Sequence, residues 1–387
     1  MSRALQGVRP ERARSKSAEG KRPQRALFIA AALFGGVSVP AWLILRQLGS
    51  RIASADWHGH ELLFGYALAV VGGFLTGPVS RPVTVGLGLA WLSARIAALI
   101  APFGVVHAAA SATFAAGLVA TAAPKLFRGP SQPRNCVLGP LVVSLLMTAA
   151  IAPFATALRP RLLLVALDLY AMLLTFMGGR LIAAAAAGAF YRRGQQLSER
   201  VQPRIEVALF ATFAVLAMCD LVAAAAQVAN WVALIGAVLS LARWMRWRLW
   251  TCFGTWNLAA LGVGYLWLAV GLALRASHAL PVWLVPSDAL HGLTIGAIGA
   301  LTLLVMGRIR AMTSGVDPER SRRLLAVAFL VNVAAVLRLA AGLSRGELRV
   351  NLLQVAGAAW VGACATLVWF LLALPSAQRR RPAGGRW

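Results

Sequence analysis

Two histidines and a glutamate stand together where a long apolar run begins. His58, His60 and Glu61 open the segment WHGHELLFGYALAVVGGFLTG, which extends from Trp57 to Gly77. Neutral imidazole is the commonest metal ligand in proteins. An ionisable group at the edge of a membrane segment is costly and is usually functional. The cluster therefore predicts a metal or cofactor site near a membrane boundary, at the mouth of a helix.

A further histidine with a nearby carboxylate lies late in the chain. His291 falls inside an apolar stretch, and Asp288 precedes it by three residues. At this spacing the two side chains share one face of a helix. A ligating imidazole usually donates its other N–H to a carboxylate or a carbonyl. Glu61 and Asp288 are therefore the candidates to support the histidines beside them.

The other two histidines have simpler interpretations. His107 stands alone on an alanine-rich segment, where a hydrogen-bonded packing role is expected more often than metal ligation. His278 lies between Arg275 and Pro281 in an expected loop, so it is interpreted as solvated. The four cysteines form no CxxC pair, so the sequence supports neither a zinc ribbon nor a covalent haem attachment.

Several more polar side chains lie within apolar stretches and must face the helix bundle or a wet cavity. They are Arg95, Asp168, Arg180, Asp220, Asn332 and Arg338. An arginine in such a place either neutralises Asp168 or Asp220 or pairs with an anionic ligand. The sequence leaves both roles open.

The composition predicts an all-α, polytopic integral membrane protein. Of the 387 residues, 59% are hydrophobic and 13% are charged, whereas soluble domains average about 45–50% apolar and about 25% charged residues. Apolar runs of this length form helices in lipid, because helices satisfy every backbone hydrogen bond. Twelve spans are expected, at about 26–47, 60–77, 83–102, 104–124, 136–156, 160–190, 206–226, 228–245, 252–274, 285–306, 324–344 and 350–374. Basic tails at 1–25 and 375–387 flank this single membrane domain of residues 26–374.

The charge distribution predicts the orientation of these helices. A net charge of +26 would suggest nucleic-acid binding in a soluble protein. In a membrane protein, however, arginines that flank the helices set the topology. Most of the 38 lysines and arginines fall on one side if the twelve spans alternate, which places both termini in the cytoplasm and all five histidines towards the outer side. The expected partner is the lipid bilayer and not a nucleic acid.

Several stretches of the chain resemble the NnrS family of bacterial membrane proteins. HGHELLFGYALAVVGGFLTG at 58–77 is similar to the family's H-x-H-E-M-L-F-G-F opening. DALHGLTIGAIGALTLLVMGR at 288–308 is similar to the family's A-L-H-A-L-T-x-G-A-I-G-x-M-T-L-x-V-M-x-R. Shorter matches are W-L-x-x-R at 91–95, R-N at 134–135, G-G-R at 178–180 and GYLWLAVGLAL at 264–274. The matches follow the family order over most of the chain.

The resemblance implies a protein of the bacterial inner (cytoplasmic) membrane that contains haem and copper and is linked to nitric oxide and nitrosative stress. It implies a non-covalent haem b or a copper ion near the outer face, with His60 or His58 and His291 as ligands. Arg95 and Arg180 are the candidate cofactor-binding arginines, for example as partners of a haem propionate. Glu61 and Asp288 would support the ligands, and whether the protein is an enzyme stays open.

The chain also departs from the family pattern at two histidine positions. Gly262 and Val263 stand where the family tends to have His-Leu, and Thr313 occupies the histidine place of a G-H-T-G turn. After G-G-R the family's I-P-x-F-T is replaced by LIAAAAAGAF at 181–190. Fewer metals than in relatives are therefore expected. Two other hypotheses stay open: a twelve-helix secondary transporter and a membrane scaffold without metal.

Overall fold

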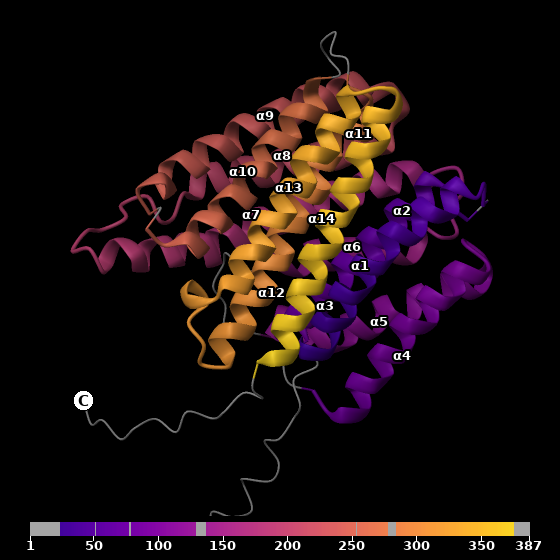
Figure 1. Cartoon of the computed structure of the whole chain (residues 1–387), viewed down its shortest axis with the longest axis horizontal. Helices are drawn as coiled ribbons and strands as arrows, with labels where there is room; N and C mark the ends of the chain where they lie inside the picture. Colours follow the sequence, from indigo (N-terminus) through magenta and orange to yellow (C-terminus); the bar gives the residue numbers. More distant parts are fainter. Residues whose placement is uncertain are drawn as a thin grey trace, which may run out of the picture.

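The computed structural model describes residues 24–50, 52–76, 79–128, 137–252, 254–277 and 284–374 (Figure 1). This part of the chain forms twelve helical segments, and it contains no strand. The all-α prediction is therefore confirmed. The predicted tails, apart from residues 24 and 25, and His278 lie outside the described residues.

Ten of the twelve segments are single helices and two are composite. The single helices are α1 (Gln24–Gln47), α4 (Arg81–Ile100), α5 (Val105–Arg128), α6 (Leu138–Ile151), α7 (Arg159–Tyr191), α8 (Pro203–Leu221), α9 (Ala226–Arg246), α10 (Trp256–Ala276), α13 (Arg322–Leu343) and α14 (Gly346–Ala373). The first composite helix joins α2 (Ala55–His60), η2 (Glu61–Ala67) and α3 (Leu68–Leu75). The second joins α11 (Pro286–Ala289), η7 (Gly292–Gly299) and α12 (Ala300–Thr313). Short 3₁₀ turns lie at Ala223–Ala225, Leu249–Cys252 and Pro318–Arg320.

Nine helices in the described part of the chain are long and apolar enough to cross a bilayer. They are Arg25–Gln47, Arg81–Ile100, Val105–Ala123, Arg159–Tyr191, Ala223–Arg246, Trp256–Ala276, Pro286–Thr313, Arg322–Leu343 and Gly346–Ala373. Of the other three segments, α6 is apolar but has only 14 residues. The chain is thus a polytopic membrane protein, while the number of twelve crossings stays a prediction.

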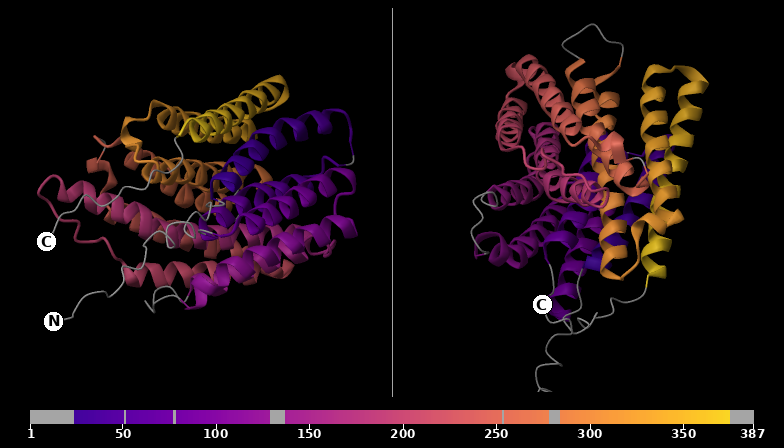
Figure 2. Two further views of the ribbon diagram at one scale, coloured as in Figure 1. Left: turned by 90° about the horizontal axis from the view of Figure 1, so that it is seen from below. Right: turned by 90° about the vertical axis from the view of Figure 1, so that its left-hand side faces the viewer.

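The first and last helices lie side by side in the bundle (Figures 1 and 2). At the beginning of α1, Arg25 Nη2 donates a hydrogen bond to the Leu372 carbonyl oxygen in the last turn of α14, at 3.4 Å. The start of the first helix and the end of the last one therefore share one end of the bundle. A chain that crosses the bilayer an even number of times begins and ends on the same side.

The first composite helix begins earlier than the sequence predicted, at Ala55 and not at residue 60. Ser54 caps it, because the Ser54 side chain accepts a hydrogen bond from the Trp57 backbone N–H at 3.1 Å. His58 and His60 therefore both lie within the helix, not at its mouth. Two residues apart on a helix, their side chains point to different neighbours.

Both composite helices contain a π-helical stretch, in which the turn is wider than in an α-helix. The stretches are Glu61–Ala67 and Gly292–Gly299, and each directly follows a histidine, His60 or His291. Such stretches are rare in proteins, and those that occur often lie at functional sites. They draw attention to the two helices that the sequence also singled out.

The glycines of these composite helices allow neighbouring helices to approach closely. A Cβ atom at Gly73 would lie 2.7 Å from the Phe28 ring, one at Gly296 2.6 Å from Trp267, and one at Gly299 2.8 Å from Trp360. Each glycine therefore faces a protein side chain. Helix packing therefore accounts for these glycines.

Candidate metal centre

Glu61 lies at the centre of a buried cluster between three helices. Its Oε1 atom lies 2.9 Å from His60 Nδ1, and its Oε2 atom lies 2.5 Å from Arg95 Nη1. The side chains of His60, Glu61 and Arg95 are 0%, 1% and 4% exposed. Because a carboxylate oxygen accepts the hydrogen bond, the His60 proton is on Nδ1 and the lone pair is on Nε2. The carboxylate thereby fixes the ring in the form that binds metals.

His107 joins this cluster from α5. Its Nε2 atom lies 3.7 Å from Glu61 Oε1, and its ring centroid lies 4.8 Å from that of His60 with the rings nearly perpendicular. One ligand atom from each of His60, Glu61 and His107 lies within 4.8 Å of the other two, so this group could hold a metal ion. The Nε2 atoms of both histidines are buried and have no hydrogen-bond partner among the described residues. Buried polar atoms are rarely left in this state without a ligand, ion or water.

A glycine in the π-helical stretch makes room for Arg95. A Cβ atom at Gly65 would lie 2.6 Å from Arg95 Nη1 and 2.6 Å from the Phe34 ring. One turn earlier on α4, Trp91 Nε1 donates to the Gly65 carbonyl oxygen at 2.8 Å. The W-L-x-x-R pattern thus places both the tryptophan and the arginine of α4 over the same point of the neighbouring helix.

The turn between α4 and α5 fixes the state of His107. Phe103 has a left-handed φ of 62°, and its backbone N–H donates to His107 Nδ1 at 3.0 Å. The Arg159 guanidinium covers the Phe103 ring at 3.5 Å from its centroid. Since Nδ1 accepts this bond, the neutral His107 ring carries its proton on Nε2. If His107 were to hold a metal through Nε2, the proton would have to move to Nδ1, which could then no longer accept the bond from Phe103.

The charges of the cluster favour a cation of low charge. One carboxylate and one guanidinium cancel, and two neutral imidazoles add nothing, so the cluster is formally neutral. An uncompensated charge is costly in a buried site, and each further unit of charge raises this cost. Imidazole is a suitable ligand for copper as well as for zinc. A monovalent ion adds half the charge of a divalent ion, so the charge balance favours the monovalent ion.

A haem does not fit between His60 and His107. Two imidazoles on opposite faces of a haem need nitrogens about 4 Å apart, twice a metal–nitrogen bond of about 2 Å, with a flat space between them. The two rings instead meet edge to face at 4.8 Å. The rings of Phe64 and Phe103 also lie 5.1 and 5.6 Å from His60. These contacts leave space for a single ion but not for a porphyrin.

The opposite face of the first composite helix carries His58, which lies near His291. The His58 ring packs on Trp42 of α1 at 4.4 Å between centroids. His291 Nδ1 donates to the Ser287 carbonyl oxygen at 2.8 Å, so its lone pair is on Nε2. The two imidazoles lie near enough to interact electrostatically. The structure therefore groups His58 with His291 and separates both from His60.

Asp288 contacts arginines and not His291. Arg338 Nη2 donates to Asp288 Oδ1 at 2.7 Å, and Arg349 Nη2 donates to Asp288 Oδ2 at 3.1 Å. The support expected for His291 from Asp288 comes instead from the Ser287 carbonyl. With two arginines for one carboxylate, this second cluster has a formal charge of +1.

Arg180 belongs to neither cluster. Its side chain is exposed, and its guanidinium lies 4.5 Å from the centroid of the Phe176 ring on the same helix. The two glycines before it make room for neighbours, because a Cβ at Gly178 would lie 2.7 Å from Tyr265 and one at Gly179 2.5 Å from Arg243. The G-G-R motif thus has a packing role on α7.

His107 is the residue that the sequence interpretation missed. It stands two residues after the start of α5, and Arg95 stands five residues before the end of α4. The two helices form an antiparallel hairpin with a short turn, so positions near the turn lie at the same level. A histidine just after such a turn and an arginine just before it are the signal that could have paired them.

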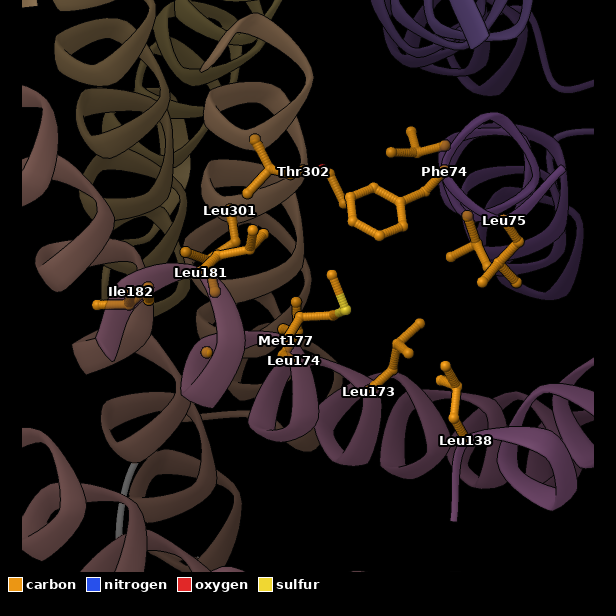
Figure 3. Close-up of a pocket in the computed structure, with 14 residues that line it drawn as sticks. Phe74, Leu75, Leu138, Leu173, Leu174, Met177, Leu181, Ile182, Leu301 and Thr302 are labelled. Carbon is orange, nitrogen blue, oxygen red and sulfur yellow. The ribbon is translucent and has the colours of Figure 1, made fainter. Parts of the chain in front are cut away.

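A separate apolar cavity of about 100 Å³ lies deeper in the bundle (Figure 3). Phe74 and Leu75 of α3 line one side, and Leu173 and Met177 of α7 line another. The described residues around it include no histidine, and Thr302 is the polar side chain among them. Ligand pockets usually have about 300–1,000 Å³, so this cavity is too small for a haem and offers it no ligand.

Comparison with known proteins identifies one family. Residues 21–379 match the family described as NnrS protein, and this range contains all twelve helical segments. None of the curated proteins compared with the chain matches it.

Proposed function

The chain belongs to the NnrS family, and on that premise we propose that it binds copper at His60 and His107 and helps to protect a bacterial cell against nitric oxide. The observation that carries the copper site is the pair of buried Nε2 atoms without hydrogen-bond partners among the described residues. The role in nitrosative stress comes from the family resemblance. The two parts of the proposal are tested separately.

Each residue of the cluster has a distinct role in this proposal. His60 and His107 are the ligands through Nε2. Glu61 accepts the His60 Nδ1–H bond and so orients the ring, as carboxylates do for ligating histidines. Arg95 neutralises Glu61, so that a bound monovalent ion brings the only net charge. A bound copper ion would supply a metal centre that can engage nitric oxide.

We further propose that the chain crosses the inner membrane twelve times, with both ends of the helical region on the cytoplasmic side. The contact between Arg25 and the Leu372 carbonyl supports an even number of crossings. The excess of lysine and arginine on alternate connections supports the orientation. In this arrangement the copper centre lies towards the outer face, where an extracellular metal or gas reaches it first.

The copper site is tested by X-ray absorption spectroscopy on purified protein loaded with Cu(I). Two imidazole nitrogens bound to copper in the wild type and the loss of one in His107→Ala support the proposal. His58→Ala is the matched control, because His58 lies on the same helix as His60 but faces the other cluster. Sulfur ligands, or a spectrum that His107→Ala leaves unchanged, would contradict the site.

The biological role is tested in cells. A bacterium that lacks its own copy of the gene is complemented with the wild type, His107→Ala or His58→Ala and is then grown with a nitric oxide donor. We expect rescue by the wild type and by His58→Ala, and poor rescue by His107→Ala at equal protein levels. Equal rescue by all three would show that the copper site does not serve this role.

A haem is the second cofactor that the family resemblance implies, and one observation favours His291 over His60 as its ligand. The His291 Nδ1–H bond to the Ser287 carbonyl leaves the Nε2 lone pair available, and this ring is not fully buried. The visible spectrum of protein made with ample haem tests this. A haem band that is lost in His291→Ala and kept in His60→Ala supports haem at His291, and a colourless protein contradicts it.

A further inference from the structure

A third ionic cluster lies apart from both histidine clusters and joins three helices. Arg275, in the last turn of α10, donates from Nη1 to Asp168 Oδ1 of α7 at 2.9 Å. Its Nη2 atom donates to both carboxylate oxygens of Asp220 of α8, at 2.5 and 2.6 Å. The side chains of Asp168, Asp220 and Arg275 are 1%, 5% and 7% exposed. All three groups are therefore shielded from water.

The charges of this cluster do not balance. Two ionised carboxylates and one guanidinium sum to −1 in a buried place within the helix bundle. An uncompensated buried charge costs several kcal/mol, which a single proton on one carboxyl group removes. Two carboxyl groups that share a site behave in this way, because like charges in contact cannot both ionise cheaply.

One guanidinium holds both carboxyl groups, and one carboxylate oxygen is left without a donor among the described residues. Asp168 Oδ2 is buried and receives no N–H or hydroxyl donor from the described residues. The Asp168 and Asp220 carboxyl groups accept hydrogen bonds from the two terminal nitrogens of one guanidinium, which holds them next to one another. Two acceptor groups form a hydrogen bond only when one of them is protonated. A proton on one carboxyl group gives the free oxygen a hydrogen-bond partner and removes the excess negative charge.

Among the described residues, Arg275 is the one cationic side chain that forms an ion pair with Asp168 or Asp220. Arg161, near the start of α7, donates to the Leu221 carbonyl at an exposed position and is within 4.0 Å of neither aspartate. The π-helical stretch Gly292–Gly299, which packs on α7 and α10, has no titratable residue. The first turn of α9, which packs on α8 and α10, has none either. Asp168, Asp220 and Arg275 therefore set the charge of this cluster among themselves.

We propose that Asp168, Asp220 and Arg275 form a buried proton-binding site in which the two carboxyl groups share one proton. The bound proton keeps the cluster neutral while the guanidinium holds both carboxyl groups together. The site stores one proton inside the bundle, and its release exposes a net negative charge. This property is independent of copper binding and of the role in nitrosative stress.

Infrared difference spectroscopy on the purified full-length protein in lipid nanodiscs at neutral pH tests the site. We expect a carbonyl stretch of a protonated carboxylic acid that shifts in deuterated water. The chain has 12 aspartates and glutamates in all, so the band can be assigned by substitution. Both Asp168→Asn and Asp220→Asn should remove it, because the remaining carboxylate then pairs with Arg275 and ionises. Asp56→Asn, at a carboxylate that is 35% exposed, is the matched control and should keep the band.

Three results would overturn the proposal. The first is a wild type without the band, which would mean that both carboxylates are ionised. The second is a band that persists in both asparagine variants. The third is a band that disappears when sodium replaces a large organic cation at constant pH, which would indicate a metal-cation site. Because asparagine has the shape of a protonated aspartate and keeps the cluster neutral, both variants should fold, and the wild-type spectrum alone already decides the first outcome.

Discussion

The two histidine clusters start from the same helix, two residues apart, and yet they have opposite electrostatic character. Each contains two imidazoles, one carboxylate and at least one arginine. In the first, Glu61 contacts an imidazole and a single arginine, and the cluster is neutral. In the second, Asp288 contacts two arginines, and the cluster carries +1. The two clusters contain the same types of side-chain group. The groups that each carboxylate contacts determine the net charge, and therefore which cluster can bind a cation.

Burial separates the two clusters further. The side chains around Glu61 are 0–4% exposed, whereas Arg338 and Arg349 are 15% and 36% exposed. A buried ion pair depends strongly on both partners, while an exposed pair contributes little. The comparison therefore makes different predictions for equivalent substitutions in the two clusters.

The largest effect is expected from Arg95→Met. This change leaves Glu61 charged and buried without its guanidinium, and we expect a loss of about 3–5 kcal/mol in the free energy of unfolding. The equivalent change in the other cluster, Arg349→Met, leaves Asp288 with Arg338 and should cost about 0–1 kcal/mol. Thermal unfolding of both variants in detergent measures the difference. Equal losses would remove the distinction between the clusters.

Copper removal should have the next largest effect. A ligand at 100 times its dissociation constant stabilises the folded state by about 2.7 kcal/mol, so a chelator should lower the melting temperature of the copper-loaded wild type. His107→Ala lacks one ligand and should melt at the same temperature with and without the chelator. A chelator effect of equal size in His107→Ala would place the metal elsewhere.

Gly65→Ala should disturb the first cluster without removing any of its charged groups. The new Cβ would lie 2.6 Å from both Arg95 Nη1 and the Phe34 ring, and we expect a cost of about 1–3 kcal/mol. Gly86→Ala on α4 is the control, because a Cβ there meets nothing within 4 Å. The measurement is the free energy of unfolding of both variants. If Gly65→Ala is as stable as Gly86→Ala, the Arg95 guanidinium can lie elsewhere.

The smallest effect is expected from His58→Ala. This change removes the contact between the His58 and Trp42 rings, which is worth about 0.5–1.5 kcal/mol. Copper content should stay at the wild-type value, because His58 faces away from the first cluster. If His58→Ala loses its copper as well as this amount of stability, the two clusters share one metal.

The fold was predictable from the sequence in its main features, because apolar length and positive charges are local properties. All twelve apolar runs correspond to helical segments, but the first composite helix begins earlier than predicted, at Ala55 and not at residue 60. Ser54 and Asp56 are a capping residue and an acidic first-turn residue, which together indicate a start at Ala55. The predicted start at residue 60 follows the beginning of the apolar run, which lies later in the chain than these two polar residues.

The candidate site was predictable only in part, because its partners come from separate helices. The sequence indicates His60, Glu61 and Arg95 as candidate site residues, and these three side chains are in contact in the structure. His107 was interpreted as a packing residue, since an alanine-rich segment gives no indication of its neighbour across the turn. Likewise, the arginine that contacts Asp168 and Asp220 is Arg275, which lies just after the end of the span expected at 252–274. Contacts between side chains of different helices depend on how each helix is rotated about its axis and on the height of each residue in the bundle. The pattern of apolar residues does not determine either.

The most direct test of the metal centre is the copper content per chain of four single variants, expressed with ample copper and purified in the same way. His60→Ala and His107→Ala should lose the copper that the wild type carries. His58→Ala and His291→Ala should keep it, because their rings belong to the positively charged cluster. Loss of copper in His58→Ala and His291→Ala with retention in His60→Ala and His107→Ala would contradict this account, as would a wild type that binds no copper.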